Sequence, residues 1–266
     1  MKAVAASRLR KAQDQMLGAR PFAHQIHRVL SGLASQVDTS AHPLLTQRAA
    51  DAPERPTLLV VVTADKGLCG SFNTNILKEA GTVITTSGSR QVTLGLVGRK
   101  GRDFFGKRGF DVRFELVNIF NHLTYSHAEA IAREAIAAYT GGEVHSVQLV
   151  YNEFKSAMTQ EVVVEQLLPI VPATYDAGAN ATDFIYEPSR EAVMDAVLPR
   201  HLTVQIFRML LESQASEMGA RMSAMDSATK NAGDLIDRLT LQYNRARQAN
   251  ITAELMEIIS GAEAIS

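Results

Sequence analysis

The segment TADKGLCGSFN (residues 63–73) holds the residue types and spacing best suited to chemistry in this chain. It follows TLLVVV (57–62), a run of β-branched and apolar residues that indicates a strand ending in a glycine-rich turn. A phosphate loop needs GxxxxGK[ST] and a dinucleotide site needs GxGxxG. Gly67 and Gly70 stand three positions apart and fit neither pattern. Backbone N–H groups at such a turn could still bind a phosphate, so a phosphate site and a structural turn both stay open.

Cys69, the only cysteine of the chain, lies inside this turn and is a candidate nucleophile. A cysteine nucleophile needs a neighbouring base, and none of the seven histidines stands at a catalytic spacing from it. A lone cysteine beside glycines is more typical of a small buried side chain. We therefore favour a structural turn made by Gly67, Cys69 and Gly70.

The other chemical candidates are weaker. His24 and His27 stand three apart on a helical pattern and could share a metal, but a solvated or partner-facing pair is the favoured interpretation. Basic residues near the N-terminus lack the aromatic residues expected of a nucleic-acid surface, so an acidic protein partner or solvent fits them better. A methionine stripe (Met209, Met218, Met222, Met225) indicates packing. We predict no catalytic residue, no cofactor and no metal, which is typical of a mechanical or scaffolding subunit.

The composition is ordinary for a soluble globular protein, with 46% hydrophobic and 21% charged residues and a net charge of −1. Bulk charge therefore names no partner. One cysteine excludes an internal disulfide framework. The sequence contains no unbroken apolar stretch long enough for a membrane span, so we expect at most a peripheral association with a membrane.

Residues 1–37 predict an N-terminal coiled-coil helix, because apolar side chains recur at alternate spacings of four and three. Pro21 interrupts this segment, and we expect a kink or a restarted helix there. Four alanines in the seam would let a partner helix approach closely. The seam positions are Ala5, Leu9, Ala12, Met16, Ala19, Ala23, Ile26, Leu30, Leu33 and Val37.

Residues 57–186 alternate strand and helix patterns, which predicts a Rossmann-like open α/β domain with right-handed crossovers. The strand candidates are 57–65, 92–98, 112–117, 146–154 and 161–169, and the helix candidates are 72–86, 99–108 and 124–140.

Residues 189–261 predict a long C-terminal coiled-coil helix that starts after Glu187-Pro188-Ser189 and is broken once, at Pro199. The simplest fold is an antiparallel coiled coil of the N- and C-terminal helices with a central Rossmann-like α/β domain. Such a helical pair buries little of its own surface, so we expect it to contact something larger.

Two long stretches resemble one family. TADKGLCGSFNTNI (63–76) resembles the conserved turn of the γ subunit of F-type ATP synthases, and QYNRARQANITAELMEIISGAEAI (242–265) resembles that family's C-terminal signature. MKAVAASRLRKAQDQMLGARPFA (1–23) and SEMGARMSAMDSATKNAGDLI (216–236) are similar to its N- and C-terminal helices. The resemblance covers essentially the whole chain.

The resemblance implies a non-catalytic central shaft that turns with the c-ring and couples proton flow to ATP synthesis or hydrolysis at the β subunits. Its implied partners are the α3β3 hexamer, the ε subunit and the c-ring. Its implied location is the cytoplasmic side of a bacterial cell inner membrane, without a transmembrane segment. Arg247, Gln248 and Thr252 match the polar positions at which the family's C-terminal helix contacts the catch region of a β subunit.

The resemblance also shows a departure. Family members usually carry a further N-terminal stretch before the match to Met1, so we expect either a start upstream or a shortened rotor. Two other function classes stay open from the sequence. One is an independent nucleotide-binding or hydrolytic α/β enzyme that uses the 63–73 turn, and the other is a coiled-coil adaptor that does not rotate.

Overall fold

The computed structural model describes residues 2–34, 42–46, 55–87, 92–171, 187 and 189–264. The chain divides into two compact units, Met1–Ser223 and Ala224–Ser266, which are described separately. The first unit contains a sheet, the helices that cover it and most of a coiled-coil pair. The second unit is the C-terminal part of one long helix.

The sheet has five strands in the order β3-β2-β1-β4-β5. Neighbouring strands among β1 to β4 are parallel, and β5 is antiparallel to β4. β1 and β2 are buried at every residue, as expected of parallel strands covered on both faces. The predicted open α/β sheet is confirmed. The strands are β1 (Thr57–Val62), β2 (Val92–Val97), β3 (Val112–Leu116), β4 (Ser146–Phe154) and β5 (Gln160–Leu168).

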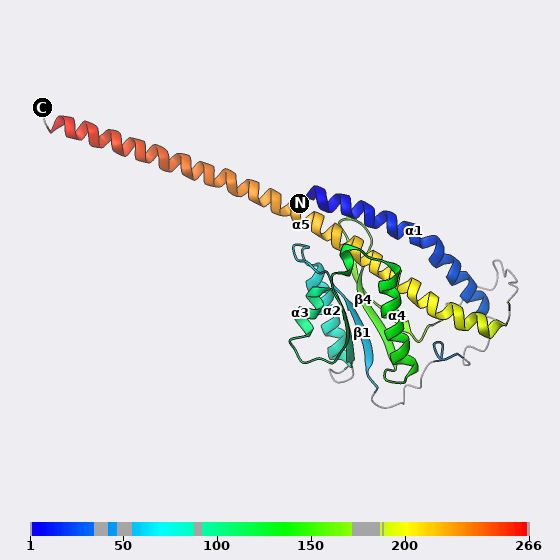
Figure 1. Ribbon diagram of the computed structural model, residues 1–266. Helices are drawn as coiled ribbons and strands as arrows, with labels where there is room; N and C mark the ends of the chain where they lie inside the picture. The colour runs from blue at the N-terminus through cyan, green and yellow to red at the C-terminus, as the bar shows by residue number, and fades with distance from the viewer. Residues whose placement is uncertain are drawn as a thin grey trace. The chain divides into compact units, whose positions relative to one another are not determined.

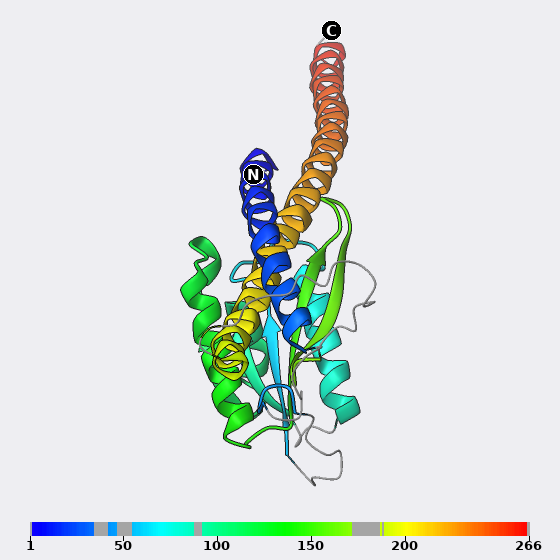
Figure 2. The ribbon, with the colours of Figure 1, turned by 90° about the vertical axis from the view of Figure 1, so that its right-hand side faces the viewer.

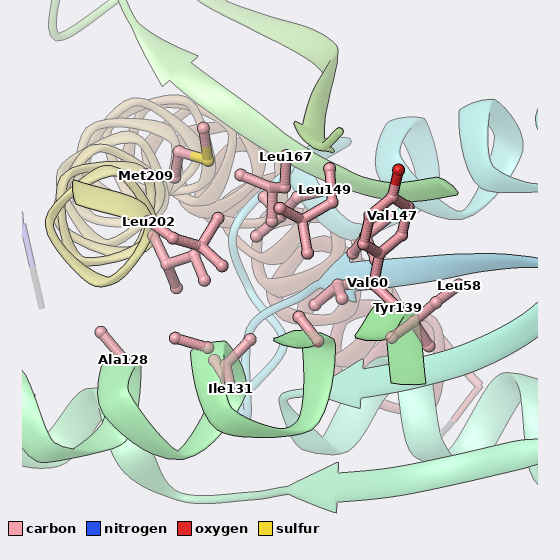
Figure 3. Packing of buried hydrophobic residues seen from close by; sticks show 14 of the residues in the cluster. Leu58, Val60, Ala128, Ile131, Tyr139, Val147, Leu149, Leu167, Leu202 and Met209 are labelled. Atoms are coloured by element: carbon pink, nitrogen blue, oxygen red, sulfur yellow. The ribbon is translucent and has the colours of Figure 1, made fainter. Parts of the chain in front are cut away.

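Alternate residues of β1 face two different layers of helices (Figure 1). Leu59 and Val61 pack in a cluster with α2 (Phe72–Ser87) and α3 (Arg99–Phe105). Leu58 and Val60 pack on the other face with α4 (Tyr125–Thr140) and the first part of α5 (Arg190–Glu263). Figure 3 shows this second cluster, in which α4, α5 and the sheet contribute side chains to one core. A short helical turn, η3 (Ile119–Asn121), precedes α4.

The N-terminal helix α1 (Lys2–Ala34) pairs with α5. Ala5, Leu9, Ala12 and Met16, the first four positions of the predicted seam, are all buried. Leu9 and Ala12 share a cluster with Ala215 and Met218. Ile26 instead packs on the cluster whose α5 members include Leu198 and Leu202. Later residues of α1 therefore pack near earlier residues of α5. The two helices are antiparallel, as predicted. Figure 2 shows the two helices side by side. The side chains of the remaining seam positions lie outside the described residues.

Two prolines lie inside helices. α1 runs without interruption through Pro21, so the helix does not restart there. The predicted break at Pro199 is wrong, because α5 also continues through it. Pro199 lacks the N–H that would bond to the carbonyl of Asp195, but Asp195 is exposed and water can satisfy that carbonyl. Leu198 and Leu202 are buried on either side and hold the helix on the core.

α5 begins at Arg190, directly after Ser189. The hydroxyl of Ser189 accepts a hydrogen bond from the backbone N–H of Ala192 at 3.2 Å, and its carbonyl accepts one from Val193. The first bond satisfies a donor of the first helical turn that has no partner within the helix, and the second is the first bond of the helix itself. From Asp226 onward, almost every described side chain of α5 is exposed. The helices of the described residues include none with the length and apolarity that a bilayer crossing requires.

Candidate functional sites: the glycine turn and the exposed part of the long helix

The turn after β1 adopts positive φ at two positions. Gly70 has a φ of 56°, where a glycine avoids the strain of a side chain. Leu68 has a φ of 64° and is 68% exposed, which the sequence analysis did not anticipate. Gly67 has no such φ, and an added Cβ there would meet only the end of the Lys100 side chain, at 4.0 Å.

Side chains of the turn accept hydrogen bonds from backbone N–H groups at the start of α3 and at Asn118. One oxygen of Asp65 accepts hydrogen bonds from the N–H of Arg99 at 3.0 Å and of Asn118 at 2.8 Å. The hydroxyl of Thr63 accepts the N–H of Gly101 at 2.8 Å. The chain's own carboxylate thus stands at the start of α3, where an anion would be bound. This arrangement leaves no open phosphate cradle at Arg99 and Gly101.

Cys69 is only 1% exposed. Its sulfur accepts a hydrogen bond from the side-chain amide of Asn73 at 3.1 Å, and Asn73 also accepts the N–H of Ala64 at 2.9 Å. Burial raises the pKa of the Cys69 thiol, and the nearby charge of Glu217 raises it further. A raised pKa disfavours the thiolate that nucleophilic chemistry needs. The geometry supports a packed cysteine that braces the turn.

α5 touches the turn through a buried ion pair. The guanidinium of Arg221 donates a hydrogen bond to the carbonyl of Gly67 at 3.2 Å and lies 2.6 Å from a carboxylate oxygen of Glu217. The Glu217 side chain is 6% exposed and that of Arg221 is 14% exposed. Burial raises the pKa of Glu217, although the charge of Arg221 opposes that shift. The sequence analysis did not identify this pair. Its only sequence signal is that Glu217 and Arg221 stand four residues apart within an apolar stripe.

A second polar network ties α5 to the sheet. Arg208 donates to both oxygens of Glu165 on β5 at 3.1 Å and to Glu212, one helical turn on, at 3.1 Å. Tyr151 on β4 donates its hydroxyl proton to Glu165 at 3.1 Å. Burial raises the pKa of both Tyr151 and Glu212. These bonds add directional contacts to the apolar packing of the helix.

Arg247, Gln248 and Thr252 all lie in the second unit, and all three are exposed. The Thr252 hydroxyl donates to the backbone carbonyl of Gln248 at 2.9 Å, so these two residues stack one helical turn apart. Their side chains are available to a partner. The predicted pair His24 and His27 lies in α1, but their side chains are outside the described residues. Within the described part of the chain, no three His, Cys, Asp or Glu side chains gather as metal ligands.

Comparisons with known proteins extend over the whole chain. The family model described as ATP synthase matches residues 1–265. The ATP synthase gamma chain of Anaeromyxobacter dehalogenans is 51% identical over 270 residues, covering 100% of this chain and 92% of the relative. The gamma chain of Chlorobaculum parvum is 47% identical over 270 residues, covering 100% of this chain and 91% of the relative.

Solved structures match as well. A chain in the cryo-EM structure of the central stalk and c-ring of Tetrahymena thermophila mitochondrial ATP synthase matches with a TM-score of 0.65 and 27% identity. The match covers 86% of this chain and 97% of that one. A chain of the Euglena gracilis mitochondrial ATP synthase matches with a TM-score of 0.62, covering 98% of this chain and 95% of that one. Its identity of 19% bears on the fold alone.

Proposed function

The chain belongs to the family of ATP synthase γ chains, and we propose that it turns with the c-ring as the central stalk and couples proton flow to ATP synthesis and hydrolysis. The observation that carries this proposal is 51% identity to a γ chain across the whole of this chain. The subunit is non-catalytic, and the β subunits of the complex supply the nucleotide chemistry. The solved relatives come from ATP synthase complexes, so the subunit works as part of such a complex.

Three partners follow from this role: the catalytic hexamer of three α and three β subunits, the ε subunit and the c-ring. We infer that this subunit is peripheral to the membrane and lies on the cytoplasmic side of a bacterial inner membrane. The exposed part of α5 supports a partner around it, because Leu235, Ile236 and Leu239 are each more than half exposed. A contiguous apolar surface of this kind typically marks an interaction site.

The structure supports a division of labour between the two candidate sites. We infer that the turn with Gly67, Cys69 and Gly70 is structural, since the Gly67 carbonyl and the Cys69 sulfur are both hydrogen-bonded within the chain. We infer that Arg247 and Gln248, with Thr252, contact the catch region of a β subunit. Their exposure supports this assignment.

The first test is purification of the tagged chain from native membranes, followed by an ATPase assay of the material that comes with it. We expect an active hexamer to copurify. Recovery of the chain alone, also when it is expressed with any native upstream residues, would contradict the proposed function.

The contact residues have a matched control in Arg245. It is also exposed on α5, but two residues from Arg247 it points to another side of the helix. Arg247→Ala removes a charged donor, and loss of a hydrogen bond of that kind costs about 1.5–3 kcal/mol when the partner is a protein group. We expect ATP-driven proton pumping to fall in Arg247→Ala and to be retained in Arg245→Ala. Equal proton pumping by the two variants would show that Arg247 does not contribute to the contact with the β subunit.

A further inference from the structure

α5 is contacted from two sides within one short segment, residues 217–221. On one side stands the turn that follows β1, which Arg221 reaches at the carbonyl of Gly67. On the other side stands the hairpin between β4 and β5, whose Ala157 carbonyl would lie 2.9 Å from a Cβ added at Gly219. The two contacts come from adjacent strands of the sheet, because β1 pairs with β4.

The Arg221 contact is directional. Its guanidinium is only 14% exposed and is oriented by Glu217, one helical turn earlier. Glu217 is buried, so solvent screens the pair weakly. A hydrogen bond to a backbone carbonyl depends on angle as well as distance. The contact therefore opposes rotation of α5 about its own axis relative to the turn.

The hairpin contact is steric. Its tip is fixed by the Ser156 hydroxyl, which accepts the N–H groups of Met158 and Thr159. Ala157 and Phe154 also pack on the cluster formed by α1 and α5. The glycine at 219 lets the helix backbone approach the hairpin closely. A fixed carbonyl against a helix backbone leaves the helix little room to turn or slide.

The rest of the α5 contact with the sheet in this unit is mainly apolar, from Met194 to Met218. Apolar burial is strong but has no preferred direction. Directional bonds decide the rotational setting of a helix on such a surface. Within α5 these include the 208–212 network on the sheet, the bonds of Gln214 to the Phe120 carbonyl at 2.9 Å and of Ser216 to the Asn152 carbonyl at 3.1 Å, and the 217–221 contacts. The 217–221 contacts lie immediately before residue 223, where the first unit ends.

We propose that residues 217–221 form a torque-transmitting joint, in which Arg221 is the positioning residue that fixes α5 to the 63–71 turn and Gly219 seats it against the hairpin. This inference rests on the proposed rotary function. It assigns to the 63–71 turn a mechanical partner on α5. Arg221 and Glu217 act through the turn and touch no nucleotide.

Cys69 reports opening of this joint. It is the only cysteine, it is buried, and it lies in the turn that Arg221 holds. A maleimide reaches it when the turn separates from α5, so its labelling rate measures the open fraction. In the purified ATP synthase, mass spectrometry of the peptide with Cys69 separates this label from cysteines of other subunits.

Arg221→Gln removes the charge and its hydrogen bond to Gly67. A hydrogen bond made by a charged group changes an equilibrium constant by roughly ten-fold or more, so we expect Cys69 labelling to accelerate by that factor. Arg221→Lys keeps the charge and a donor, and we expect it to restore most of the protection. Arg200→Gln is the matched control, the same change at an exposed arginine of the same helix, and we expect the wild-type rate.

The mechanical claim needs a second readout. With the hexamer fixed to a surface and a bead attached through the exposed 106–109 turn, the angular variance of a stalled complex reports torsional stiffness. We expect a larger variance for Arg221→Gln than for Arg200→Gln. Faster Cys69 labelling with an unchanged angular variance would overturn the proposed joint, because Arg221 would then only hold the turn locally. Unchanged labelling in Arg221→Gln would overturn the proposal as well. Failure of the wild-type chain to assemble with the hexamer would contradict the proposed function instead. Labelling of Cys69 in the free chain would then still show whether Arg221 holds the turn against α5.

Discussion

Gly219→Ala tests how closely α5 packs on the hairpin between β4 and β5. The added Cβ would lie 2.9 Å from the backbone carbonyl oxygen of Ala157, closer than a carbon and an oxygen normally approach. The same atom would lie 3.3 Å from the side-chain amide of Gln160, which can move aside. The carbonyl belongs to a hairpin held by hydrogen bonds, so the strain falls on the backbone.

The magnitude follows from two opposed effects. Replacing a helical glycine by alanine stabilises a helix by about 1 kcal/mol. Overpacking a close contact costs about 1–3 kcal/mol. Gly81 in α2 is the matched control, because a Cβ there meets nothing within 4 Å and only the first effect applies. We expect Gly81→Ala to raise the free energy of unfolding by about 1 kcal/mol, and Gly219→Ala to fall about 1–3 kcal/mol below Gly81→Ala.

Urea unfolding followed by tyrosine fluorescence provides the assay. The chain has no tryptophan, and Tyr139 and Tyr151 are buried in the first unit, so their emission reports its unfolding. Comparing the two variants cancels the helix-propensity gain that they share. If Gly219→Ala proves as stable as Gly81→Ala, the hairpin does not press on α5 and the steric half of the proposed joint is refuted.

Two further predictions concern charge and backbone. Burial raises the pKa of Glu212 above its ordinary value of 4.5, so its neutral form is favoured in the folded state. Its contribution to stability is present below about pH 4.5 and is lost as the pH rises through the folded pKa, and Glu212→Gln should flatten that fall in a pH series of urea midpoints. Gly98 has a φ of 92°, and a Cβ there would lie 2.0 Å from the carbonyl oxygen of Thr63. Gly98→Ala should cost more than about 3 kcal/mol of unfolding free energy or prevent folding, whereas a stable variant would contradict this close approach.

Much of the fold could be predicted because its signals are local. The run TLLVVV has one polar residue, Thr57, followed by five apolar ones, and it forms the central strand buried on both faces. The spacing of Leu9, Ala12 and Met16 named the face of α1 that packs on α5. Pro199 was misjudged because a proline breaks a helix only when the helix has no other support, and the buried neighbours Leu198 and Leu202 supply that support.

The site could be predicted only in part. The turn at 63–73 was located from its glycines, and the sequence favoured a packed Cys69, but the residues that hold it are distant in the chain. Arg221 lies 154 positions from Gly67, and no local pattern pairs a side chain with a backbone carbonyl. Leu68 at a positive φ was also missed, because a leucine rarely adopts this conformation and its residue type gives no signal of it.

The strand order suggests why this fold serves a shaft. In open parallel sheets, ligands bind beyond the carboxyl ends of strands where the order reverses, and here that position falls between β1 and β4. The 63–71 turn leaves the end of β1, and the hairpin at 155–159 leaves the end of β4. Both meet α5, through Gly67 and Ala157. The position that would bind a cofactor in other α/β proteins is therefore taken by α5 of the same chain. This position thus serves to attach the helix that must transmit force.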